Sequence, residues 1–121
     1  MKLKQGLKCI YFNADQLLNK MEDLRLIVTN DVPDIIMITE VIPKAQINPI
    51  QEPIMKTEGY QIFTNFEFTE ECLGASGRRG VAIYVSDKID VERVRLKTYY
   101  HDHLWLKLKL RNNDSLLVGC I

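Results

Sequence analysis

Two polar side chains close two apolar segments of this 121-residue chain. Asn13 follows the segment 7–12 (LKCIYF), and Glu40 follows the segment 34–39 (DIIMIT), with a helical pattern between them. A strand-helix-strand unit makes its two strands parallel, so we expect both side chains at the same carboxyl edge of a sheet, where open α/β sheets place ligands. A carboxylate beside a neutral amide at that edge can hold a hard divalent cation such as Mg²⁺, which takes oxygen ligands and keeps several waters.

The elements that position these two residues follow a β-α-β pattern. The first strand is expected over 7–13 and the second over 34–39, whose unbroken apolar run is typical of a central strand covered on both faces. Between them, Asn19 and Glu22 have the spacing of a helix-capping box. The helix should end near 29–31, because Pro33 disfavours the helical conformation of Val32 before it.

Further strands are expected downstream, at 60–65, 80–86, 91–99, 104–110 and 115–121. The polar tetrad 111–114 joins the last two strands as a hairpin. The chain therefore begins as β-α-β and continues with mostly antiparallel strands. This order predicts a mixed β-sheet on an α/β plan, in a single domain spanning 1–121.

Composition places the chain among globular proteins with a packed core, because 46% of its residues are apolar and 26% are charged. Its longest apolar segments fall well short of the roughly 20 residues that span a bilayer, so no membrane partner is expected. The cysteines are odd in number and lack the spacing of a zinc site; they are Cys9, Cys72 and Cys120. Reduced thiols in an intracellular protein, nuclear or cytoplasmic, are the expectation.

Charge is balanced overall but unevenly placed along the chain. Residues 1–75 hold 7 Lys and Arg against 11 Asp and Glu, whereas residues 76–121 hold 9 against 5. One interpretation is ordinary surface charge. The other is a basic half that faces phosphates beside an acidic half that holds a metal.

A glycine-rich loop precedes the strand expected at 80–86. Arg78 and Arg79 in this loop could contact phosphates, because a guanidinium matches phosphate oxygens in a bidentate arrangement. The simpler alternative is a solvated loop tip. The loop lacks the Lys-Ser/Thr pair of a phosphate-binding P-loop, so that motif is excluded.

Taken in order, five segments resemble the amino-terminal half of an endonuclease/exonuclease/phosphatase domain. They are most similar to the apurinic-endonuclease-like endonucleases of non-LTR retrotransposons. The segments are FNADQL at 12–17, PDIIMITE at 33–40, GYQIF at 59–63, GRRGVAIYVSDKI at 77–89 and LWLKLKLRNNDSLLVGCI at 104–121. The resemblance covers nearly the whole chain. It implies a deoxyribonuclease-like fold, of which this chain would form half of a four-layer α/β sandwich.

The resemblance also implies roles for individual residues. Asn13 matches the family asparagine at the phosphate and metal site, and Glu40 matches the metal-binding glutamate. Asp15 stands where some members carry a further acid. Ile42 replaces a residue that is usually polar or basic, and the nearby Lys44 could supply the missing phosphate contact. Mg²⁺ or Mn²⁺, held weakly by this chain, is the expected cofactor, and DNA is the expected substrate. The simpler alternative is that Glu40 is a solvated carboxylate at the end of a strand and that Asn13 caps a turn.

The later elements of the family would lie beyond residue 121. They are a Tyr after the last strand, an Asp-x-Asn pair, a further Asp and a terminal Asp-His dyad. The expectation is therefore a fragment of a metal-dependent, phosphodiester-cleaving endonuclease that is inactive alone and self-associates through an exposed sheet face. The alternative is a non-catalytic α/β module whose basic half, 76–121, binds an acidic or nucleic-acid partner. A phosphatase acting on inositol phosphates or a lipid head group is a further branch of the same family.

Overall fold

The computed structural model describes residues 6–42, 55–65, 79–95, 103–110 and 113–121. These residues form two helical segments, η1 (Leu17–Lys20, a 3₁₀ turn) and α1 (Met21–Asp31), and seven strands. The strands are β1 (Cys9–Asn13), β2 (Ile35–Thr39), β3 (Tyr60–Thr64), β4 (Val81–Ser86), β5 (Asp90–Val94), β6 (Leu104–Lys109) and β7 (Ser115–Cys120). Among the described helices, none combines the length and the apolar character needed to cross a membrane.

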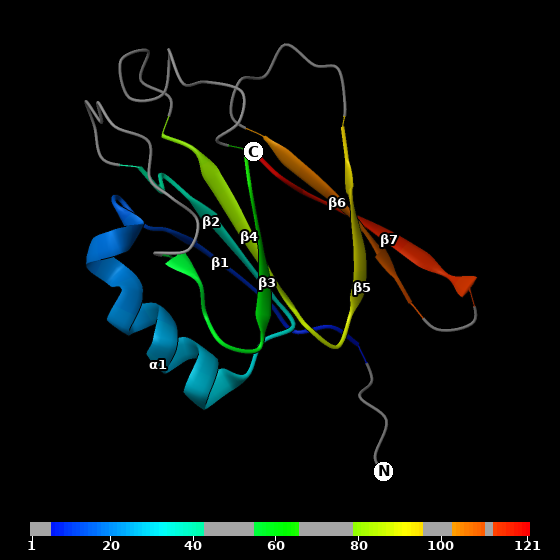
Figure 1. Ribbon diagram of the computed structural model, residues 1–121, viewed down its shortest axis with the longest axis horizontal. Coiled ribbons are helices and arrows are strands. Elements are labelled where there is room, and N and C mark those ends of the chain that lie inside the picture. The colour runs from blue at the N-terminus through cyan, green and yellow to red at the C-terminus, as the bar shows by residue number, and fades with distance from the viewer. Residues whose placement is uncertain (1–5, 43–54, 66–78, 96–102, 111–112) are drawn as a thin grey trace.

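The strands divide between two sheets (Figure 1). The first has the order β1-β2-β4-β3, with β1 and β2 parallel and β4 antiparallel to both of its neighbours. The second, β5-β6-β7, is antiparallel throughout, and β6 and β7 pair as the predicted hairpin. The mixed α/β class, the β-α-β start and the central place of β2 are therefore confirmed. The expectation of one mixed sheet is wrong, because β5, β6 and β7 form a sheet of their own.

Both faces of the first sheet are covered. Alternate residues of a strand point to opposite faces, so Ile36 packs in the cluster that contains Leu24 of α1, whereas Ile35 packs in the cluster that contains Leu106 of β6. All three of these side chains are fully buried. Figure 1 shows α1 on one side of the sheet and the β5-β6-β7 sheet on the other. Among the described residues, the β5-β6-β7 sheet therefore covers the face of the first sheet that carries Ile35.

The two ends of the helix differ in how well the sequence predicted them. The capping box is wrong: Lys20 is the N-cap of α1, with no side-chain cap bond, and the Asn19 amide instead donates to the Gln16 side chain at 2.9 Å. The 3₁₀ turn η1 occupies the place where the α-helix was expected to begin. The carboxyl end is as predicted, because Val32 before Pro33 leaves the helix with a left-handed φ of 43°.

The expected strand at 91–99 is shorter in the structure, where β5 ends at Val94. Residues 96–102 lie outside the described residues. In β6, buried and more exposed residues alternate, as the sequence pattern predicted for a half-exposed strand. Its buried face supplies Leu104, Leu106 and Leu108 to the cluster between the sheets. Through these leucines the hairpin packs onto the face of the first sheet that carries Ile35.

Candidate functional site

Asn13 and Glu40 lie at the same rim of the first sheet. Asn13 is the last residue of β1 and pairs in register with Thr39, the last residue of the parallel strand β2, so Glu40 follows directly at that edge. The backbone contacts continue past the strand ends, since Ala14 N–H donates to Thr39 O and Gln16 N–H donates to Glu40 O, both at 3.0 Å. The prediction that Asn13 and Glu40 lie at the same carboxyl edge of a sheet is therefore confirmed.

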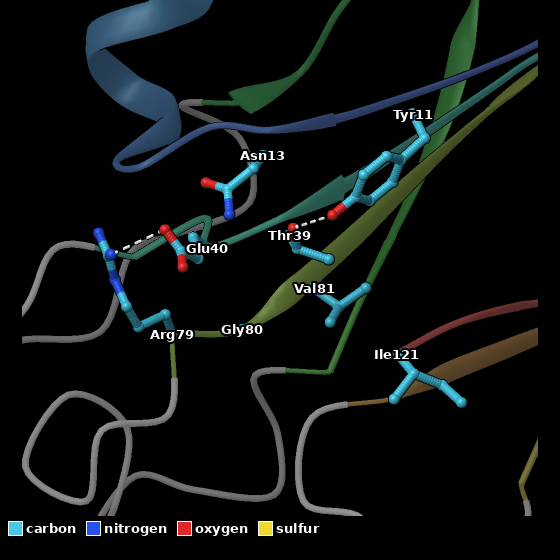
Figure 2. Close-up of a pocket in the computed structure, with 8 residues that line it drawn as sticks. All are labelled: Tyr11, Asn13, Thr39, Glu40, Arg79, Gly80, Val81 and Ile121. Carbon is cyan, nitrogen blue, oxygen red and sulfur yellow. Dashed lines mark hydrogen bonds and ion pairs between the residues drawn. The ribbon is translucent and has the colours of Figure 1, made fainter.

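A pocket of about 260 Å³ opens at this rim (Figure 2). It is lined by Tyr11, Asn13, Thr39, Glu40, Arg79, Gly80, Val81 and Ile121. These residues come from the carboxyl ends of β1 and β2, the start of β4 and the end of β7. The volume is below that of drug-sized ligand pockets and suits a small polar group.

Left-handed backbone conformations cluster at the rim. Asp15, Gln16 and Glu40 have φ values of 42°, 80° and 53°, which residues other than glycine rarely adopt. Such conformations persist only where the surrounding structure enforces them, and they cluster at functional sites. Here the enforcing contacts are the hydrogen bond from Gln16 to Glu40 and a second one from Leu17 N–H to Val41 O at 2.9 Å. The bends bring the carboxylates of Asp15 and Glu40 to one side chain.

That side chain is Arg79. Its Nη2 lies 2.6 Å from Asp15 Oδ1, and its Nη1 lies 3.0 Å from Glu40 Oε2. Its Nε donates to Ile42 O at 3.0 Å, while Ile42 N–H donates back to Arg79 O at 2.7 Å. The Arg79 side chain is 11% exposed, against 71% for Asp15 and 39% for Glu40. One buried guanidinium therefore bridges two more exposed carboxylates, and the three charges sum to one negative charge.

The uncharged polar groups of the pocket are held by local hydrogen bonds. Asn13 Oδ1 accepts a hydrogen bond from Asp15 N–H at 3.1 Å, a local bond typical of asparagine in turns. With its oxygen so engaged, Asn13 presents its amide Nδ2 as a donor. The hydroxyl oxygens of Tyr11 and Thr39 lie 2.8 Å apart and share a hydrogen bond on the other side of the pocket. The pocket thus combines one amide donor and two hydroxyls with the carboxylate of Glu40.

Four predicted site residues come together in the structure: Asn13, Asp15, Glu40 and Arg79. Arg78 and Lys44 lie outside the described residues, so their predicted phosphate contacts stay predictions. For Arg79 the sequence left a phosphate contact and a solvated loop tip as alternatives; the structure instead buries the side chain and pairs it with carboxylates. Sequence reasoning missed this bridge because 39 and 64 residues separate Arg79 from Glu40 and Asp15. Opposite charge was the only signal available.

A divalent cation fits this site through one carboxylate. Among the residues that the structure describes, no group of three or more His, Cys, Asp or Glu side chains could hold a metal ion. Mg²⁺, however, is commonly bound through one or two carboxylates and keeps several waters. Glu40 can serve in this way while Arg79 contacts only its Oε2. The carboxylate oxygen Oδ1 of Asp15 faces the guanidinium, so a direct metal contact from Asp15 stays a prediction.

No protein-family model matches the sequence, and no curated protein matches it either. The indications of function are therefore the geometry of the rim pocket and the resemblance of the five sequence segments.

Proposed function

We propose that this chain is the amino-terminal part of a deoxyribonuclease-like endonuclease domain of the kind found in non-LTR retrotransposons. Its rim pocket would bind a phosphodiester of DNA together with Mg²⁺ or Mn²⁺. The observation that supports this best is that Asn13 and Glu40 end neighbouring parallel strands and line one pocket. The helix and the two sheets would then be three layers of a four-layer α/β sandwich.

The charge of the site explains why phosphate and cation must bind together. Asp15, Glu40 and Arg79 leave one negative charge, which repels a phosphate. Glu40 is the residue that would hold the cation. When bound, a divalent cation polarises the phosphate and stabilises the leaving oxygen. Asn13 would donate its amide to a phosphate oxygen, and the hydroxyls of Tyr11 and Thr39 are further polar groups within the pocket.

The pocket supports binding better than turnover. Of its described lining residues, none carries an imidazole that could activate a water molecule. A positioned general base contributes about 10²–10⁴-fold to such reactions. We therefore propose that the 121-residue chain binds DNA without appreciable cleavage.

The affinity for a short DNA duplex containing an abasic site tests this proposal. Fluorescence anisotropy would be measured in Mg²⁺ and in EDTA for the wild type, Glu40→Gln and Asn13→Ala. Asn13→Ala should weaken binding in Mg²⁺ about tenfold, because a hydrogen bond to a charged group is worth roughly 1.5–3 kcal/mol. Glu40→Gln should also weaken binding in Mg²⁺, because it removes the charged ligand of the cation. Glu92→Gln is the matched control, since Glu92 is exposed on β5, outside the pocket. Equal affinities for wild type and Glu40→Gln would refute the proposal.

The alternative, a binding module that uses the basic half 76–121, has less support. Two acidic residues of β5 lie opposite two lysines of β6: Asp90 pairs in register with Lys109, and Glu92 with Lys107. Opposite charges facing each other across strands offset one another locally. These pairs therefore interrupt the basic charge of the second sheet with acidic side chains.

We also propose that the chain self-associates with a second copy, through the second sheet. Its edge strand β7 carries Leu116 and Leu117, which are 39% and 54% exposed. An edge strand presents unpaired backbone groups that can pair with another strand. Sedimentation velocity should show concentration-dependent association. A monodisperse monomer that binds no hydrophobic dye would count against it.

An intracellular setting, nuclear or cytoplasmic, is part of the same proposal. Cys9 and Cys120, the two cysteines that the structure describes, are thiols that do not form a disulfide. Free thiols are typical of reducing compartments. Targeting to a nucleus or cytoplasm can be followed by fluorescence microscopy of a tagged chain, and secretion of the tagged chain would contradict this setting.

A further inference from the structure

The guanidinium of Arg79 contacts the carboxylate of Glu40, the proposed cation ligand, and that of Asp15 beside it. We propose that Arg79 is a built-in counter-ion that restrains divalent-cation binding at Asp15 and Glu40 and so keeps the affinity of the site low. The inference rests on the proposed function in taking Glu40 as the cation ligand, and on the prediction that the charge of Asp15 lies close to the bound ion.

The first support is the geometry of the contacts. Separate nitrogens of one guanidinium reach the two carboxylates, Nη2 to Asp15 at 2.6 Å and Nη1 to Glu40 at 3.0 Å. Both carboxylates therefore lie within reach of a single cationic group. The positive charge of Arg79 occupies the position from which a divalent cation would neutralise them together.

The second support is the difference in burial. Arg79 is 11% exposed and is anchored to the backbone of Ile42 in both directions, so its charge is fixed in place. Asp15 and Glu40 are 71% and 39% exposed, so an incoming ion can reach them from solvent. Such an ion meets a fixed charge of its own sign, and like charges repel more strongly where solvent is partly excluded.

The third support is charge counting. With Arg79 present, the three side chains sum to one negative charge, and without it they sum to two. The affinity of oxygen-ligand cation sites depends strongly on the number of charged ligands. Removing the guanidinium charge should therefore tighten cation binding, whereas a residue that merely positions Glu40 for the ion should weaken binding when it is removed. The two roles predict effects of opposite sign.

The test is Mn²⁺ binding to the full chain, measured by isothermal titration calorimetry without DNA. Arg79→Met should bind Mn²⁺ roughly tenfold or more tightly than wild type, because the site gains one net negative charge. Arg79→Lys, which keeps the positive charge, should show no comparable gain. The double variant Arg79→Met with Glu40→Gln should lose the gain. Asp15→Asn, which keeps Arg79 and removes one negative charge, should bind Mn²⁺ more weakly than wild type.

Circular dichroism would establish that each variant is folded. An Arg79→Met affinity equal to or below that of wild type overturns the inference, as does a gain that survives Glu40→Gln. If Arg79→Met does not fold, Arg79→Gln, which keeps a polar side chain without the charge, decides: tighter binding than wild type supports the inference, and unchanged or weaker binding overturns it.

The outcome also separates this inference from the proposed function. Suppose that Arg79→Met binds Mn²⁺ more tightly but that Glu40→Gln binds DNA as well as wild type does. This result would support the counter-ion role of Arg79 and refute the nuclease-like function. DNA binding that depends on Glu40, without tighter Mn²⁺ binding by Arg79→Met, would give the reverse result.

Discussion

Arg79 and Glu40 meet at the carboxyl rim of the first sheet, with Nη1 3.0 Å from Oε2, although 39 residues separate them in the sequence. The same guanidinium reaches Asp15, which follows β1, and the backbone of Ile42, which follows β2. One side chain thus connects three segments of chain: those after β1 and β2, and the one before β4. These three segments border the candidate site and meet at the guanidinium of Arg79.

Arg79→Ala should lower the free energy of unfolding by about 1–3 kcal/mol, because it removes charged hydrogen bonds from a mostly buried group whose partners are partly solvated. Urea denaturation measures the change. Asp15→Asn is the control: Asp15 is 71% exposed, so its substitution should cost less than about 1 kcal/mol. Equal denaturation midpoints for wild type and Arg79→Ala would mean that the bridge contributes nothing to stability.

Gly119→Ala should destabilise the hairpin of β6 and β7. A methyl group at Gly119 would lie 2.2 Å from the ring of Trp105, its neighbour in register on β6. Overpacking of this kind typically costs about 1–3 kcal/mol. Thermal unfolding and the fluorescence of Trp105, the only tryptophan of the chain, report the change. Ser115→Ala, on the exposed start of the same strand, should leave both nearly unaltered.

Cys120 should make stability depend on pH in the alkaline range. Burial raises the pKa of its thiol from 9.0 to about 11. The unfolded thiol loses its proton at lower pH than the folded one, so this contribution is complete below pH 9.0 and is lost as pH rises to about 11. The loss should be on the order of 1–3 kcal/mol in urea denaturation.

Cys120→Ala should show a smaller decrease over this pH range, whereas Cys9→Ala, at an exposed position, should behave like wild type. An identical pH dependence for Cys120→Ala and wild type would contradict the assignment. At neutral pH the exposed Cys9 should also react with iodoacetamide faster than the buried Cys120.

The wild-type chain should show no appreciable nuclease activity on abasic or supercoiled DNA in Mg²⁺. The physical reason is that a general base typically contributes about 10²–10⁴-fold, and the described pocket residues offer no imidazole for that role. Gel electrophoresis of the DNA after long incubation measures any turnover. Cleavage that disappears in Glu40→Ala would show that the chain is an active enzyme after all.

The features that the sequence predicted correctly are those set by local pattern and chain direction. The apolar runs located β1 and β2, and the helix between them required parallel pairing, which brought Asn13 and Glu40 to one rim. The capping box failed because the 3₁₀ turn η1 precedes α1, a choice that Asn19 alone does not determine.

The features that could not be predicted depend on contacts between distant segments. Strand periodicity shows which residues of β6 are buried, but not whether the hairpin extends the first sheet or packs onto its face. Likewise, Arg79 in a glycine-rich loop is compatible with a phosphate partner. Only the bends at Asp15 and Glu40 bring two carboxylates to it.

Anomalous diffraction from crystals soaked with Mn²⁺ and a dinucleotide tests most directly whether the rim pocket holds a cation and a phosphodiester together. We predict an anomalous peak beside the carboxylate of Glu40, with the phosphate within hydrogen-bonding distance of the Asn13 amide. Mn²⁺ bound only elsewhere on the molecule, or a phosphate that avoids this pocket, would contradict the account.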